Sequence, residues 1–94
     1  RLPGHYHGSE NYSVFAPRLE IINYYMEELR KYGWEFIAEE DNVEKSNGKK
    51  VEEKYIFRNG TYELQISFPV ETTVNFEGVV YEKSYYIIVF PINR

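Results

Sequence analysis

Two Asn-Gly dipeptides, at residues 47–48 and 59–60, constrain the fold more than any other feature of this sequence. Each is flanked by segments in which apolar and polar residues alternate. Asn-Gly is typical of two-residue hairpin turns, because both residues tolerate a positive φ. The sequence therefore predicts three antiparallel strands joined by two hairpins, at about 34–45, 49–58 and 61–68.

If both turns are two-residue loops, the register of the hairpins follows from the numbering. Phe57 then lies opposite Ala38 in one hairpin and opposite Tyr62 in the other. Directly opposed residues share a face of a sheet, so most large apolar side chains fall on one face. That face comprises Trp34, Phe36, Ala38, Val51, Tyr55, Phe57, Tyr62, Leu64, Ile66 and Phe68. The other comprises Glu35, Glu39, Glu52, Lys54, Glu63, Gln65 and Ser67, with Ile37 and Ile56 as apolar exceptions.

A helix is predicted over about 17–32, before the first hairpin. Pro17 suits the first turn of a helix, where its missing N–H is not needed, and Gly33 suits the position just beyond the end. Apolar residues recur at spacings of three and four and form one stripe, which we expect to pack on the apolar face of the sheet. The stripe comprises Leu19, Ile22, Met26 and Leu29.

The last third of the chain predicts further strands. Residues 70–76 carry apolar side chains at even positions, and residues 85–90 are apolar at every position. A strand of the second kind is usually covered on both faces. Because one helix can cover only one face, the other face is expected to be covered by an N-terminal arm, a second copy of the chain or a foreign ligand. The arm offers Tyr6, Tyr12, Val14 and Phe15 for this.

These features predict an α+β fold with two layers, in which an N-terminal helix packs on one face of a four- to five-stranded antiparallel meander sheet. The 94 residues allow one domain. We expect an arm at residues 1–16, without regular structure at its start, and a single α+β domain at residues 17–94. The chain begins at Arg1 without a methionine, so we expect that an upstream segment was removed.

The segment Val79–Val89, VVYEKSYYIIV, resembles the hairpin region of cystatins, which are inhibitors of cysteine proteases built from a helix and an antiparallel sheet. The resemblance covers eleven residues and implies a cystatin-like outline. The inhibitory motif of that family has a glutamine two residues before a valine and a glycine two residues after it. This chain has Gly78 before and Glu82 after Val80, so the resemblance does not imply protease inhibition.

The charge pattern argues against nucleic-acid binding. The net charge is −4, and acids and bases alternate along the chain. Phosphate binding needs clustered Lys and Arg, and the only basic run is Lys49-Lys50. No apolar stretch approaches the roughly 18–20 residues that span a bilayer, so we expect a soluble chain without a membrane span. The absence of cysteine excludes disulfides and thiolate sites and leaves the compartment open.

Catalytic chemistry has no support in the sequence. His5 and His7, with Glu10, are the only candidate metal ligands, and two histidines in a Gly-rich arm are more often exposed. The paired carboxylates Glu27-Glu28, Glu39-Glu40-Asp41 and Glu52-Glu53 fall beside turns or on the polar face. No Gly-x-Ser-x-Gly elbow or phosphate-binding glycine loop is present. We expect no cofactor, no metal and no enzymatic activity.

Ten tyrosines favour recognition of another molecule, since tyrosine combines a large contact area with a polar tip. The first hypothesis is a non-catalytic binding or assembly module that contacts a protein partner, or forms a homo-oligomer, through the last strand. Its binding residues would be Tyr81, Tyr85, Tyr86, Ile88 and Phe90. One alternative is a small-ligand-binding domain or minor enzyme with a pocket between helix and sheet, where Glu53 and Tyr55 are the candidate polar groups. Another is an acidic inhibitor that mimics nucleic acid.

Overall fold

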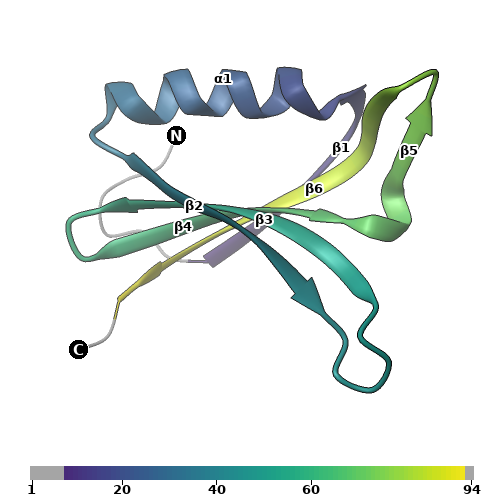
Figure 1. Cartoon of the computed structure of the whole chain (residues 1–94). Helices are drawn as coiled ribbons and strands as arrows, with labels where there is room; N and C mark the ends of the chain where they lie inside the picture. Colours follow the sequence, from purple (N-terminus) through teal and green to yellow (C-terminus); the bar gives the residue numbers. More distant parts are fainter. Residues whose placement is uncertain (1–7, 93–94) are drawn as a thin grey trace.

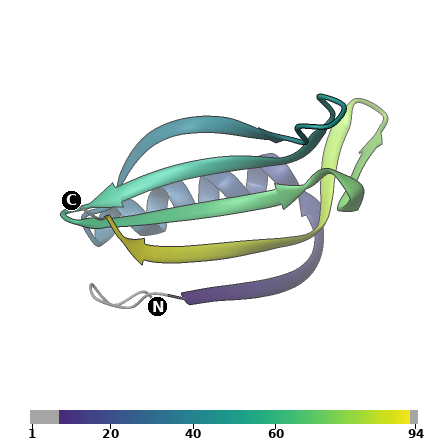
Figure 2. The ribbon, with the colours of Figure 1, turned by 90° about the horizontal axis from the view of Figure 1, so that it is seen from below.

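The computed structural model describes residues 8–92, which form one α-helix, one short 3₁₀ helix and six strands. In chain order these are β1 (Gly8–Pro17), α1 (Arg18–Lys31), β2 (Glu35–Val43), β3 (Lys50–Asn59), β4 (Tyr62–Pro69), η1 (Val70–Thr72), β5 (Thr73–Phe76) and β6 (Val79–Pro91). All strand pairs are antiparallel, in the order β1-β6-β4-β3-β2, and β5 pairs with β6. The helix lies across one face of the sheet (Figures 1 and 2).

The predicted meander of four or five strands is wrong in number and order. Residues expected to form an arm instead form β1, which pairs with β6 along the edge of the sheet. The long strand β6 therefore lies between β1 and β4. Strand β1 extends the sheet in its own plane and does not cover the second face, as the arm was expected to do; Tyr6 lies outside the described residues. An edge strand pairs on one side only, which explains why a sequence rich in Ser, Asn and Gly suffices.

The second hairpin differs from its predicted register by two residues. Its turn residues are Gly60 and Thr61, and Phe57 lies opposite Leu64 instead of Tyr62. Gly60 has a positive φ of 61°, whereas Thr61 does not, as a turn of type II′ requires. Because side chains alternate with a period of two, a shift of two residues leaves every side chain on its predicted face.

The first hairpin departs further from the prediction. Glu44 and Lys49 close a longer loop, in which Gly48 adopts a φ of 71° and Asn47 Oδ1 accepts the Lys49 N–H at 2.9 Å. Along the strands the register shifts twice, between Phe36 and Ala38 and between Asn42 and Val43. Ala38 consequently lies opposite Ile56, not Phe57, and moves to the face away from the helix. A bulge inserts one residue into one strand, which reverses the side-chain alternation that a regular hairpin would have.

The helix ends as the sequence indicates. Gly33 has a φ of 90°, the Trp34 N–H bonds to Leu29 O at 3.0 Å and the Gly33 N–H bonds to Arg30 O at 3.1 Å. This is a Schellman motif, in which glycine supplies the left-handed residue. The predicted stripe is wrong at Leu19, whose side chain is 71% exposed. Ile21 is buried instead, because Arg18, Ile21 and Ile22 share the face that points to the sheet.

The core contains buried residues from both layers. Its members are Ile21, Ile22, Leu29, Trp34, Phe57, Leu64, Ile66, Phe68, Tyr85, Ile87 and Val89. Five of the ten residues predicted for the apolar face are among them, and Tyr55 and Tyr62 pack against them. Val51 is 40% exposed because it lies at the start of β3, and Phe36 is 41% exposed because it lies on the edge strand β2. Among residues 8–92, no helix is long and apolar enough to cross a membrane.

Candidate functional site

The first residue of α1 places a guanidinium against the sheet. Arg18 Nε donates to Glu82 Oε2 of β6 at 2.5 Å, and its Nη1 pairs with Glu53 Oε1 of β3. The Arg18 guanidinium carbon also lies 4.9 Å from the centre of the Phe68 ring. Glu82 is fully buried, and its other oxygen accepts the Thr73 hydroxyl at 2.7 Å. The network therefore ties the start of the helix to four strands, β3, β4, β5 and β6.

A second cation completes this network at its exposed side. Lys50 Nζ lies 2.5 Å from Glu53 Oε2 and 3.8 Å from Asp41 Oδ2. The hydrogen bond from Lys50 lowers the pKa of Glu53 most; partial burial acts against this, and Arg18 lowers it further. Burial would lower the pKa of Arg18, but hydrogen bonds and charges from Glu53 and Glu82 outweigh it and raise that pKa. Arg18, Lys50 and Glu53 are therefore ionised at neutral pH.

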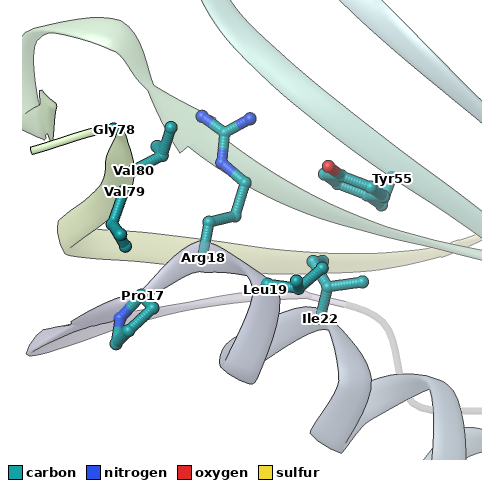
Figure 3. Close-up of a pocket in the computed structure, with 8 residues that line it drawn as sticks. All are labelled: Pro17, Arg18, Leu19, Ile22, Tyr55, Gly78, Val79 and Val80. Carbon is teal, nitrogen blue, oxygen red and sulfur yellow. The ribbon is translucent and has the colours of Figure 1, made fainter.

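A cavity of about 360 Å³ lies beside Arg18, between the start of α1 and the hairpin of β5 and β6. Figure 3 shows Arg18 extending from the helix, with Val80 on one side and Tyr55 on the other. Arg18 and Tyr55 supply its polar side chains, and its remaining lining is apolar or glycine. The full lining is Pro17, Arg18, Leu19, Ile22, Tyr55, Gly78, Val79 and Val80. Small-ligand sites commonly combine a mainly apolar wall with few polar groups in this way.

Exposed apolar side chains surround the cavity. Leu19 and Val79 both line it and are 71% and 41% exposed. Phe76, directly opposite Val79 in the β5–β6 hairpin, is 60% exposed. Exposed apolar residues that gather around one concavity are more typical of a binding site than residues scattered singly.

Tyr55 connects the cavity to the polar network. Burial raises the pKa of the Tyr55 hydroxyl, as do a hydrogen bond with Glu39 and its charge, while Arg18 acts in the opposite direction. The bulge at Ile37 makes this possible, because it places Glu39 opposite Tyr55. Tyr55 thus stays protonated at neutral pH, donates its hydroxyl proton to Glu39 and keeps an oxygen that can accept a hydrogen bond from a bound molecule.

The five residues predicted to form a binding surface are divided between the two faces of the sheet. Tyr85 is buried in the core, stacked on Tyr12 at 5.1 Å, and shares a hydrogen bond of 2.9 Å with Tyr25. Tyr86, Ile88 and Phe90 are half-buried on the opposite face, which no element among residues 8–92 covers (Figures 1 and 2). Tyr81 stacks on Phe15 of β1, with ring centres 5.0 Å apart. The assignment of these five residues to a binding surface stays a prediction.

Most of the central tyrosines belong to an aromatic row between helix and sheet. Tyr25 meets Tyr85 edge-on, Tyr85 contacts Phe68, and Phe68 contacts Tyr55, with ring centres 5.7 to 5.9 Å apart. Burial and the hydrogen bond with Tyr85 raise the pKa of Tyr25. These rings fill the interior, as aromatic pairs commonly do, and the tyrosine content therefore reflects packing as well as surface.

The predicted pair of Glu53 and Tyr55 lies near the cavity, but sequence reasoning missed Arg18 and Glu82. One signal was present, because Arg18 lies one turn before Ile21 and Ile22 on the same helical face. Among residues 8–92, no three carboxylate or histidine side chains converge on a metal position, and His5 and His7 lie outside the described residues. Comparison with protein families, curated proteins and solved structures finds no match to this chain.

Proposed function

We propose that this protein is a non-catalytic binding domain whose ligand places an apolar group in the cavity beside Arg18. One observation carries the proposal: a concavity of about 360 Å³ with a mainly apolar lining lies open between the start of α1 and the β5–β6 hairpin. Its volume falls at the lower end of the range for small-ligand sites, roughly 300–1,000 Å³. The proposed domain is similar in outline to cystatins only because it combines one helix with an antiparallel sheet.

The charge balance at the cavity favours a neutral ligand. The cationic side chains Arg18 and Lys50 already pair with carboxylates, those of Glu53, Glu82 and Asp41. A carboxylate ligand would have to compete with two carboxylates that already engage Arg18. A neutral molecule with a hydroxyl end avoids this competition and can donate a hydrogen bond to the Tyr55 oxygen.

Amide chemical shifts test the proposal with two matched probes, n-hexanol and hexanoate. At roughly 0.6 kcal/mol for each of its non-hydrogen atoms, hexanol would gain about 4 kcal/mol, which corresponds to a Kd near 1 mM. We expect saturable shifts at Leu19, Tyr55 and Val80, and several-fold weaker binding of hexanoate. Shifts spread over the whole surface, or tighter binding of hexanoate, would contradict the proposed ligand class.

A pair of tryptophan variants provides the control. Val79→Trp introduces a bulky ring at the mouth of the cavity and should abolish the saturable shifts. Val43→Trp makes the same change at a residue of β2 that is 47% exposed and does not line the cavity, so it should leave them unchanged. Equal effects of the two variants would show that the probes bind elsewhere.

A second candidate is contact with a protein partner through the face opposite the helix. Tyr86, Ile88 and Phe90 lie together there on alternate positions of β6, half-buried within the uncovered face. Tyr86 donates to the Glu52 carboxylate at 2.7 and 2.9 Å, so its ring is held in one orientation. A partner bound to this face would be released by Ile88→Glu and retained by Val79→Trp, whereas a ligand of the cavity would respond in the reverse way.

A further inference from the structure

The sheet ends in two edge strands that differ in charge. Strand β2 carries Glu35 together with the acidic run 39–41, and its pairing with β3 is interrupted by register shifts. Strand β1 spans ten residues and carries one acid, Glu10, and no Lys or Arg. Charged residues and bulges are the usual protection of an edge against pairing with another chain. Strand β1 also has one register shift, between Ser13 and Ala16, but in charge the two edges differ: β2 is protected along its centre, whereas β1 is uncharged over most of its length.

The positions of the acidic residues also show that β1 is better suited than β2 to pair with a copy of itself. In an antiparallel pair related by a two-fold axis, residues whose numbers have a constant sum lie opposite each other. For β2, every register centred between residues 39 and 41 places acids directly opposite acids, which is unfavourable. For β1, Glu10 meets its own copy only when the pair is centred on Glu10 itself.

We propose that β1 pairs antiparallel with β1 of a second copy of this chain, so that the sheet continues across a two-fold axis. The strand that pairs with this edge comes from a second copy of the chain, because two β1 strands place like charges opposite each other only in the register centred on Glu10. The interface is closed, since each copy uses its β1 edge once. It also partly covers the ring of Phe15, which is 66% exposed on this strand.

The dimer is weak and depends on salt. Pairing of one strand per copy buries less surface than the roughly 1,200–2,000 Å² of a standard interface. Each copy carries a net charge of −4, so the two copies repel each other at low ionic strength. Screening reduces this repulsion, because the Debye length falls from about 30 Å at 10 mM salt to about 8 Å at physiological salt. Raising the salt concentration over this range therefore favours the dimer.

Analytical ultracentrifugation of two double variants tests the proposal. Asn11→Lys with Ser13→Lys adds two positive charges at exposed positions of β1. Asn42→Lys with Ser46→Lys makes the same two replacements at exposed positions of β2 and the following loop. Both change the net charge from −4 to −2, so they reduce the overall repulsion equally. Only the first pair places lysines of the two copies beside each other across the proposed strand pair.

We expect the wild type to shift from monomer to dimer between about 10 µM and about 1 mM, a range typical of weak association. The β1 variant should stay monomeric over this range at physiological salt, and the control variant should dimerise at least as well as the wild type. Circular dichroism and thermal unfolding of each monomer check that the fold is kept. A monomeric wild type at the highest concentration would overturn the proposal. So would a dimer that the β1 variant retains or that only the control variant loses. These outcomes are independent of the cavity, since neither variant changes a residue that lines it.

Discussion

The two ends of α1 are attached to the sheet by different interactions. Near its C-terminal end, Leu29, Trp34 and Phe57 are at most 4% exposed and pack through apolar contact. At its N-terminal end, Arg18 reaches the fully buried Glu82 and the partly exposed Glu53. Apolar burial stabilises the fold in proportion to the buried area and has little directional preference. A buried ion pair adds little net stability, but the loss of one partner strongly destabilises the fold, because the other charge is left buried and unpaired. The C-terminal end therefore supplies stability, and the N-terminal end fixes how the helix begins on the sheet.

The largest effect is expected at the apolar end. Phe57→Ala removes a side chain that is 1% exposed and should lower the free energy of unfolding by about 4 kcal/mol, within the range for buried Phe→Ala changes. Phe36→Ala is the control, because its ring contacts Phe57 at 5.5 Å but is 41% exposed. Urea unfolding should show a loss of about 1 kcal/mol or less for this control. Equal losses would mean that the end near Phe57 is not tightly packed.

The next effect is expected at the ionic end. Glu82→Ala removes one partner from a buried pair and leaves Arg18 with Glu53 alone, so we expect a loss of about 3 kcal/mol in urea unfolding. The double variant Arg18→Met with Glu82→Leu replaces both charges by apolar groups of similar size. Its stability should lie within about 1 kcal/mol of the wild type, since such replacements are often neutral. If the double variant were less stable than Glu82→Ala, the ion pair would be a net stabilising element, and both ends of α1 would supply stability.

The apolar end was largely predictable from the sequence, for a physical reason. Side chains on a strand alternate with a period of two, so an error of two residues at the Gly60 turn did not move Phe57 or Leu64 to the other face. Gly33 likewise identified the end of the helix, because a left-handed residue is needed there. Both features are encoded by residues close together in the chain.

The ionic end and the cavity were less predictable, because they depend on distant residues. Arg18 and Glu82 are 64 positions apart, and nothing in the local pattern around either residue reveals that they meet. Edge pairing by β1 uses backbone hydrogen bonds, which any residue except proline can form. The bulge at Ile37 moved Ala38 to the other face and Glu39 to Tyr55, a consequence of backbone geometry that the alternating pattern does not show. The cavity arises where these elements meet.

The smallest effect concerns pH and involves the ionic end of α1 alone. The pKa of Glu53 is lowered below its ordinary value of 4.5, first by the hydrogen bond from Lys50 and further by Arg18. A group with a depressed pKa in the folded state contributes stability above its unfolded pKa, and that contribution is lost as pH falls through the folded value. The Lys50 side of the network is exposed, so we expect a contribution below about 1 kcal/mol.

Glu53→Gln isolates this contribution from that of the other carboxylates. Near pH 7 the variant should be less stable than the wild type in urea unfolding, and the difference should shrink as pH falls below 4.5. Glu71→Gln, at an exposed residue of η1 for which no ion pair is seen among residues 8–92, is the matched control and should not alter the pH profile. A Glu53→Gln difference that is constant with pH would reflect packing, and Arg18 would then be held by Glu82 alone. In that case the start of the helix would depend on one buried pair, and the effect of Glu82→Ala should exceed that of Phe57→Ala.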